Sequence, residues 1–248
     1  MQPTRSAPRA ATVSGDIATE EANVDVAAAI RGRRAVRDYT DRPVPDDVLD
    51  RLLRLALAAP TGSGAQAWDL VVVRDPDLGR RVAEIVIDGG ARYFAINRPR
   101  AEGADDEAHA AWARGNAERL LATYRHVPVW VLGCVTPRRE YPPEMAQTGP
   151  LDDVMSVAFA MENLMLAARA VGLGTCPTTA FWQLEEQRLR AALEIPDDVR
   201  PVVLTPVGYP TRFPEGRPPA LRNGRPWRTF VHDDAYGHGR GEAADPAA

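Results

Sequence analysis

The sequence predicts one domain in which helices and strands alternate around a single sheet, which is the pattern of an α/β protein. Four short apolar runs have the length and composition of buried strands, and stretches with apolar residues at helical spacing separate them. No Gly-, Ser- or Pro-rich linker interrupts this alternation. A chain of 248 residues also buries enough surface to fold without disulfides or a structural metal.

The predicted domain covers residues 23–235. Residues 1–22 are rich in Ala, Pro, Thr and Ser and lack apolar periodicity, which is typical of a disordered tail. Residues 236–248 are mostly Gly, Ala and acidic residues, so we expect a flexible C-terminal tail. Residues 211–235 form a Pro-, Gly- and Arg-rich arm with too few apolar side chains for a core of its own, so we expect it to dock on another surface.

Two helices are expected before the first strand. The first, over about 23–33, begins at the capping residue Asn23 and carries Val26 and Ile30 on one face. The second, over about 46–60, begins at two aspartates that oppose the helix dipole and ends at a proline.

The other elements follow in order along the chain. Strands are predicted at 68–73, 127–135, 175–178 and 201–207, with a last short strand at 229–231. Helices are predicted at 76–86, 107–124, 151–171 and 184–193, while residues 88–108 combine Gly, Pro and acids and show no clear pattern.

The helix at 151–171 is apolar on most of its sides, so it is expected to be central, with its methionines packed in the core. Cys134 and Cys176 lie in apolar stretches and in no CxxC pair, which predicts two small buried residues.

Composition and motif searches exclude several classes of function. The net charge of -4 comes without any basic block, which speaks against a nucleic-acid partner. No run of 18 apolar residues predicts a membrane span, and the polar N-terminus lacks a secretory core, so we expect a cytoplasmic protein. All 30 basic residues are Arg, which excludes a Schiff-base lysine and a P-loop lysine. The four histidines show no metal-ligand spacing and no GxSxG motif occurs, so metalloenzyme and hydrolase functions gain no support.

Four stretches carry residue types suited to ligand binding. Residues 33–39 hold three arginines that can grip a phosphate or form a solvated helix end. Residues 59–68 are small and allow a ligand close to the backbone, although an ordinary loop has the same composition. Residues 172–181 can aim backbone N–H groups at a ligand, and residues 222–227 hold two arginines suited to an anion or to a plain basic tail. Each pattern alone leaves both interpretations open.

In their order along the chain, these stretches resemble the nitroreductase family of flavin enzymes. The motifs that carry the resemblance are Arg33-Arg34-x-x-Arg37, Ala59-Pro60-Thr61, Gln66-x-Trp68, Gly172-Leu173-Gly174-Thr175-Cys176, Ile195-Pro196 and Gly208-Tyr209-Pro210, followed by the arginine-rich arm. The resemblance covers Ala27 to His232. Any one motif is loose, but their shared order is specific.

The resemblance implies an α+β fold: a three-layer sandwich with a central mixed, mostly antiparallel sheet between helices. It implies an intertwined homodimer with FMN at the interface. It also implies an FMN-dependent oxidoreductase that uses NAD(P)H as reductant and a small nitroaromatic, quinone or enone-like acceptor in a ping-pong mechanism. The flavin N5 atom is then the reactive centre, so neither a catalytic side chain nor a metal is expected.

The resemblance assigns the cofactor site residue by residue. Arg33 is expected to hold the FMN phosphate, with Arg34 and Ala35 beside the phosphate and ribitol. Arg37 is expected near flavin N1 and O2, where its permanent charge stabilises the reduced flavin. Asn116 is expected at the pyrimidine edge. The backbone donors near N5 are expected at Thr178, Thr179 and Ala180. The loop from the partner subunit is expected at Pro60, Thr61, Gly62 and Gly64, and the phosphate clamp in the arm at Arg222 and Arg225.

The chain departs from the family pattern at three positions. Ala35 and Gly64 stand where the family often has Ser and Asn, and Ala67 stands where it often has Pro. The last two departures point to a specialised enzyme. Two other functions stay open: an FMN- and oxygen-dependent dehydrogenase in a biosynthetic route, with a flavin-destroying relative in cobamide synthesis as its variant, and a non-catalytic flavin-binding protein.

Overall fold

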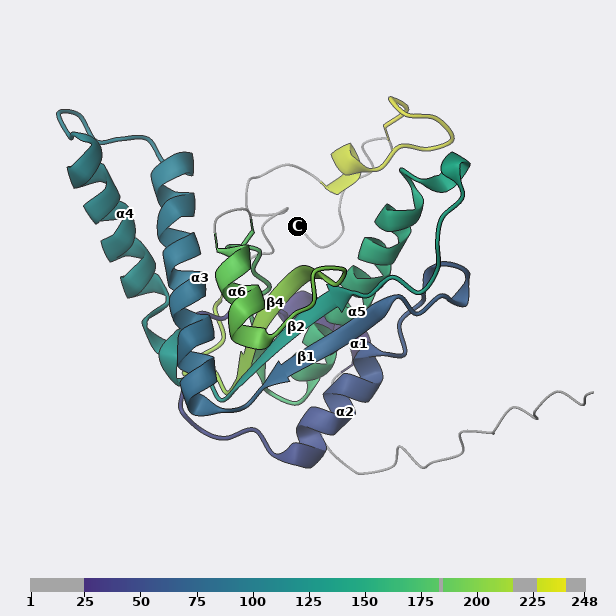
Figure 1. Ribbon diagram of the computed structural model, residues 1–248, viewed down its shortest axis with the longest axis horizontal. Helices are drawn as coiled ribbons and strands as arrows, with labels where there is room; N and C mark the ends of the chain where they lie inside the picture. The colour runs from purple at the N-terminus through teal and green to yellow at the C-terminus, as the bar shows by residue number, and fades with distance from the viewer. Residues whose placement is uncertain (1–24, 183–184, 216–226, 240–248) are drawn as a thin grey trace, which may run out of the picture.

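The computed structural model describes residues 25–182, 185–215 and 227–239, and Figure 1 shows how its helices and strands are arranged. In chain order the elements are α1 (Val26–Gly32), α2 (Asp46–Ala56), η1 (Gly62–Gly64), β1 (Trp68–Val73), α3 (Pro76–Asn97), α4 (Asp106–Leu120), η2 (Ala122–His126), β2 (Val129–Val135), η3 (Pro143–Met145), α5 (Gly149–Ala170), β3 (Gly174–Thr175), α6 (Glu186–Leu193), β4 (Arg200–Gly208) and η4 (Trp227–Phe230). The expected tail at 1–22 and the last part of the expected C-terminal tail, residues 240–248, lie outside the described residues.

The four strands form one sheet in the order β1-β2-β4-β3, and each neighbouring pair is antiparallel. Ala35 adds a parallel pairing with Thr175 beside this sheet. The α+β fold with a mixed, mostly antiparallel sheet is therefore confirmed, and the α/β pattern inferred from the alternation of elements was wrong. Alternation along the chain does not fix strand direction: the α3–α4 pair brings the chain back antiparallel to β1 instead of making a parallel crossover.

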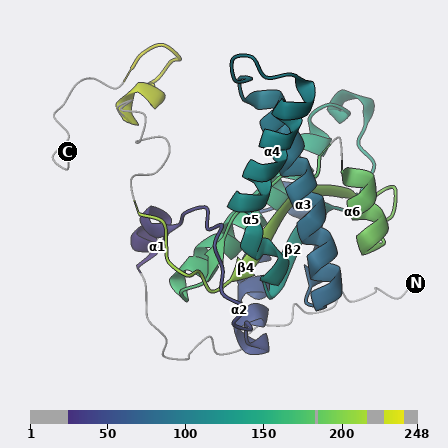
Figure 2. The same cartoon turned by 90° about the vertical axis from the view of Figure 1, so that its left-hand side faces the viewer.

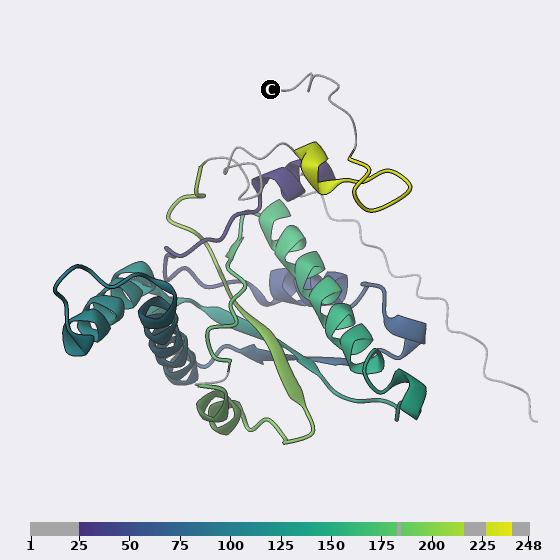
Figure 3. The same ribbon diagram turned by 90° about the horizontal axis from the view of Figure 1, so that it is seen from above.

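Two apolar layers sandwich the sheet, and Figure 3 shows the strands passing between α5 and the group of α3, α4 and α6. Alternate residues of β2 point to opposite faces, as the period of a strand requires. Trp130 and Leu132 pack with α3, α4 and α6, whereas Val129 and Val131 pack with α2 and α5. Gly133 lets α5 lie close to the sheet, because a Cβ there would meet Val157 at 2.8 Å.

The helices α3 and α4 form a long pair that extends away from the sheet (Figures 1 and 2). Asp75 caps α3 by accepting from the Leu78 amide at 2.7 Å, and the helix continues to Asn97. Residues 88–97, which showed no clear pattern, are thus helical. Gly89 and Gly90 are poor helix formers, but both sit at close packing contacts with other elements, and that packing offsets the low propensity.

The described chain leaves one apolar face uncovered. Asp25, rather than Asn23, caps α1, and the side chains of Val26 and Ile30 are 68% and 56% exposed. On α5 the residues facing the sheet are buried, but Leu151, Met155 and Phe159 recur every fourth residue on the outside and are 59%, 47% and 49% exposed. The prediction that this helix is surrounded by the core is therefore wrong for a single chain, because only the face of α5 toward the sheet is buried. The prediction that both cysteines are buried is confirmed.

The last described segment is not extended. Residues 227–230 form η4, and the Val231 amide donates to the Arg228 carbonyl at 3.2 Å, so the predicted strand at 229–231 is wrong. The run Thr229-Phe230-Val231 has strand-like composition, but composition forms a strand only where a sheet edge is available. Among the described residues, no helix is both long and apolar enough to cross a membrane.

Candidate functional site

Three of the sequence motifs lie side by side at the β3 edge of the sheet. The Val36 amide donates to the Thr175 carbonyl at 3.0 Å, and the Thr40 amide donates to the Tyr209 carbonyl at 2.9 Å. Gly174 makes the first contact possible, because a Cβ at this position would lie 2.8 Å from the Val36 side chain. The segment that carries the opening arginines is thereby held along the edge of the sheet.

A cavity of about 740 Å³ opens next to this segment. Its lining combines the opening segment, the end of α4, η2 and the start of the C-terminal arm: Ala35, Arg37, Asp38, Arg119, Leu120, Ala122, Thr123, Arg212, Phe213, Pro214 and Glu215. The lining includes three guanidinium groups but also two carboxylates, so it favours a ligand with negative charge at defined points rather than an anion alone.

Asn116 and Arg119 bring α4 into this site. Arg119 lies one helical turn after Asn116 and donates to its side-chain oxygen, while the Asn116 amide group donates to the Trp112 carbonyl at 2.8 Å. The predicted residue Asn116 is thus hydrogen-bonded to Arg119, which lines the cavity. Arg119 itself was missed, although its i+3 spacing from Asn116 was visible in the sequence.

The backbone of Arg37 is fixed from below. The Thr123 hydroxyl donates to the Arg37 carbonyl at 3.2 Å and accepts from the Tyr39 amide at 3.0 Å. Tyr39 and Tyr124 are buried, and burial, followed by the neighbouring Cys176, raises the pKa of each phenol well above its ordinary value. Both phenols therefore stay neutral, and the two rings pack against each other with centroids 5.9 Å apart.

Arg33 directly follows α1 and lies against α5, outside the lining of this cavity. Its Nε lies 3.4 Å from the Glu162 carboxylate. The preceding residue is anchored as well, because Arg169 Nε donates to the Gly32 carbonyl at 3.1 Å. Arg34 folds back and donates to the Arg33 carbonyl at 2.7 Å. The C-terminal end of α1 is thus pinned on the last two turns of α5.

The segment Thr178–Ala180 continues from β3 and has only part of its hydrogen-bonding capacity left. The Thr178 amide donates to the Leu204 carbonyl at 2.8 Å, and the Ala180 amide donates to the Thr178 hydroxyl at 3.1 Å. Of these three amides, only that of Thr179 has no hydrogen-bond acceptor within the described part of the chain. Of the three predicted donors, Thr179 has the amide best placed to meet a ligand.

The predicted loop Pro60–Gly64 lies elsewhere in the same chain. The Gly62 amide donates to the Ser156 hydroxyl at 3.2 Å, near the start of α5. Ser63 and Gly64 have φ values of 52° and 67°, in the left-handed region that a non-glycine residue occupies at some cost. A tight, strained loop of this kind is typical of a binding position.

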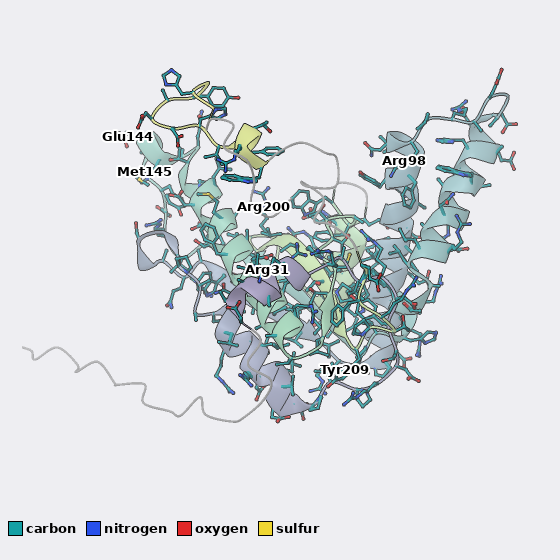
Figure 4. The ribbon with its side chains drawn as sticks, turned by 180° about the vertical axis from the view of Figure 1, so that it is seen from behind. Arg31, Arg98, Glu144, Met145, Arg200 and Tyr209 are labelled. Carbon is teal, nitrogen blue, oxygen red and sulfur yellow. The ribbon has the colours of Figure 1, made fainter. Side chains whose placement is uncertain are left out.

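One chain does not bring this loop to its own arginine cluster. Ser156, which holds the loop, and Arg169, which holds the end of α1, are 13 residues apart on α5, or about 20 Å along the helix. In Figure 4, Arg31 of α1 lies away from Glu144 and Met145, which precede the start of α5. Arg222 and Arg225, the predicted phosphate clamp, lie outside the described residues. Among the described residues, no group of three or more His, Cys, Asp or Glu is placed to hold a metal ion.

Comparisons with known proteins agree on the family of this chain. The model of the nitroreductase family matches residues 30–209. A "Putative NADH dehydrogenase/NAD(P)H nitroreductase" of Methanothermobacter thermautotrophicus is 26% identical over 196 residues, which is 78% of this chain and 82% of the relative. FMN reductase (NADPH) of Bacillus subtilis is 24% identical over 212 residues, which is 84% of this chain and 72% of the relative.

The fold is shared with solved structures. An iodotyrosine deiodinase bound to FMN and 3-iodo-L-tyrosine superposes with a TM-score of 0.58 at 21% identity, over 78% of this chain and 94% of that one. At that identity the likeness shows the fold alone. The family match, however, runs from the end of α1 to β4. The chain therefore belongs to the nitroreductase family, as the order of its motifs predicted.

Proposed function

We propose that this protein is an FMN-dependent oxidoreductase that takes reducing equivalents from NAD(P)H and delivers them to a small organic acceptor. The observation that carries the proposal is the cavity in which Arg37 and Arg119 lie beside the end of α4 that bears Asn116. The two relatives named above, an NAD(P)H nitroreductase and an NADPH-linked FMN reductase, support the same reductants.

The residues present fit FMN. The cavity of about 740 Å³ lies within the range of cofactor sites. Two guanidinium groups that never deprotonate line this cavity, and they are proposed to meet the negative charge of a reduced flavin near N1 and O2, with the Asn116 amide at the adjacent pyrimidine edge. Ala35 is small enough to leave room for the ribitol chain beside the sheet edge.

Arg33 and Arg34 are proposed as phosphate ligands, together with Arg222 and Arg225 of the arm. Arg33 engages Glu162 through Nε, which leaves the forked end of its guanidinium group suited to a phosphate. Thr178, Thr179 and Ala180 are proposed to line N5, with Thr179 as the main donor because its two neighbours already donate within the chain.

A homodimer is proposed to complete each site. The loop Pro60–Gly64 lies about 20 Å along α5 from the arginine cluster of its own chain, so it reaches a flavin only from a second copy. The exposed stripe Leu151, Met155 and Phe159, with Val26 and Ile30 of α1, offers the apolar surface for that pairing.

When bound, FMN would supply the redox chemistry, a hydride transfer from NAD(P)H to a nitroaromatic, quinone or enone-like acceptor in a ping-pong order. The protein's own groups hold and polarise the ring. Arg37 and Arg119 favour the reduced charge state, and Thr123 keeps the Arg37 backbone in place.

The absorption spectrum of the purified protein, before and after incubation with FMN, tests the proposal. We expect a yellow protein whose visible band bleaches when NADH or NADPH is added without oxygen and returns when an acceptor follows. A protein that remains colourless after incubation with FMN overturns the proposal. Flavin that is reduced by an organic substrate but not by NAD(P)H, and reoxidised by oxygen, favours the oxygen-dependent dehydrogenase instead. Flavin that is reduced but passes electrons to no acceptor favours a non-catalytic flavin-binding protein.

A further inference from the structure

Gly89 in α3 forms the tightest backbone contact described for any glycine of the chain. A Cβ built on Gly89 would lie 1.9 Å from the Ala180 carbonyl oxygen and 2.6 Å from the Ala180 carbonyl carbon. Both are backbone atoms, so no side-chain rotation relieves the clash. Gly89 is buried, which means that the Thr178–Ala180 segment rests directly on the backbone of α3.

The next residue connects the same point of α3 to the other wall of the site. A Cβ built on Gly90 would lie 3.4 Å from Leu121 and 3.7 Å from the Cβ of Ala117, which are ordinary van der Waals distances. Ala117 follows Asn116 directly, and Arg119 comes two residues later on α4. One short piece of α3 therefore contacts both α4 and the Thr178–Ala180 segment, but of the two glycines only Gly89 has no room for a side chain.

We propose that Gly89 is a positioning residue of the flavin site: its missing side chain sets the spacing between Thr178–Ala180 and the α4 wall that carries Asn116 and Arg119. This inference rests on the proposed function, because it assigns the two walls to the N5 side and the pyrimidine edge of one FMN. Any Cβ at position 89 must move the segment outward by about 1 Å, from 1.9 Å to at least 3.0 Å. Displacements of this size near a reacting group change rates by roughly a hundredfold.

A second feature keeps the segment rigid once it is seated. The Thr178 hydroxyl accepts from the Ala180 amide at 3.1 Å, and the Thr178 main chain pairs in both directions with Leu204 at 2.8 and 3.1 Å. A displacement at Ala180 is therefore passed to Thr179, whose amide lies between these two fixed points. The Thr179 donor is the group expected to lose its alignment.

The test compares Gly89→Ala with Gly90→Ala, two identical changes at adjacent positions of one helix. Both replace glycine by a better helix former, so the helix propensity gained is the same in each. Circular dichroism and thermal unfolding first establish that each variant is folded. The FMN dissociation constant is then measured by fluorescence, and the midpoint potential of the bound flavin by equilibration with a redox dye.

We expect Gly90→Ala to match the wild-type protein in both measurements. Gly89→Ala should raise the FMN dissociation constant by on the order of tenfold and shift the midpoint potential, because the N5 donor is displaced. A merely structural role lowers the unfolding temperature but leaves the potential of retained flavin unchanged. Equal affinity and equal potential in the two variants overturn the inference while the proposed function stands. A wild-type protein that takes up no FMN overturns both.

A second pair of variants decides the matter if Gly89→Ala does not fold. Thr178→Val removes the hydroxyl that holds the Ala180 amide, and Thr178→Ser keeps it. The Val variant should show the same shift in midpoint potential and weakened FMN binding, and the Ser variant should restore both. Wild-type values in the Val variant contradict a positioned Thr178–Ala180 segment.

Discussion

Individual arginines of this protein have different surroundings, and the residues that each one contacts distinguish their proposed roles. Arg37 and Arg119 line a cavity, whereas Arg33, at the end of α1, pairs with Glu162 of α5 outside that cavity. Gly64 departs from the family pattern in its side chain but not in the backbone conformation that the position requires. Its φ of 67° lies in the left-handed region, which Asn, the residue expected from the family pattern, also tolerates. The change therefore removes a side chain from the proposed site without altering the turn.

Replacing Arg33 by Ala should weaken FMN binding by roughly tenfold, since a charge-assisted contact with phosphate contributes about 1.5 kcal/mol or more. Riboflavin, which lacks the phosphate, serves as the control ligand and should bind both proteins equally. Fluorescence titration measures both affinities. A loss of the same size for riboflavin and FMN contradicts the phosphate assignment.

Arg119→Gln removes a cation that is proposed to lie near N1 and O2. The reduced flavin should then bind more weakly relative to the oxidised flavin, by roughly 1 kcal/mol for this exposed side chain, which lowers the midpoint potential. Arg138→Gln is the matched control, because Arg138 pairs with Asp69 at 2.9 Å on the opposite edge strand. The same potential in both variants argues against Arg119 as a flavin-stabilising group.

The two cysteines should be inert in the folded protein. Burial, with a smaller contribution from Asp69, raises the pKa of Cys134 to about 12, and Cys176 is also buried. Iodoacetamide at pH 8 is expected to modify neither thiol until denaturant is added, as mass spectrometry can follow. Rapid labelling of either cysteine without unfolding contradicts the packing described.

Among the elements, α3 is held in place by charged groups as well as by glycine contacts. Asp88, immediately before Gly89, accepts from Arg114 of α4 and, at 2.6 Å, from Arg188 of α6. Partial burial raises the pKa of Asp88, but the hydrogen bonds from Arg188 and Arg114 outweigh it, so the net pKa is lowered. The carboxylate therefore ties three helices together at the point where α3 meets Ala180.

Asp88→Asn should lower the free energy of unfolding by about 1 kcal/mol at pH 7. Because the folded pKa lies below the unfolded value of about 3.9, the wild-type advantage is complete above that value and is lost as the pH falls through the folded pKa. Urea unfolding from pH 7 down to pH 3 measures this dependence. Asp50→Asn, on the exposed face of α2, should be neutral throughout. An Asp88 effect that persists undiminished at the lowest pH contradicts the ion-pair account.

Across the whole molecule, the uncovered stripe on α5 and the distant loop Pro60–Gly64 lead to the same prediction. Met155→Asp places a charge in the stripe and should shift the protein to monomers in sedimentation experiments, with release of FMN. Leu57→Asp is the control, because Leu57 is 45% exposed on α2, close to the 47% of Met155, but outside the stripe. Monomers that retain FMN at full affinity contradict a site shared between two copies.

The sequence by itself determined the family and most of the elements. Caps, prolines and apolar periodicity are local properties, so β1, α2, α5 and β4 could be predicted within a few residues. The order of the motifs pointed to the nitroreductase fold, and two of the residues singled out in the sequence, Ala35 and Arg37, line one cavity together with Arg119, which donates to Asn116.

Tertiary structure alone decided the rest, because those features depend on contacts between residues far apart in the chain. Strand direction followed from how α3 and α4 return the chain, and the helical state of residues 88–97 followed from packing that glycine propensity opposes. The outward face of α5 resembled core in sequence, because an apolar side chain looks the same in the sequence whether or not the folded chain covers it. The contact between Gly89 and Ala180 joins positions 91 residues apart, and no local pattern in the sequence predicts it.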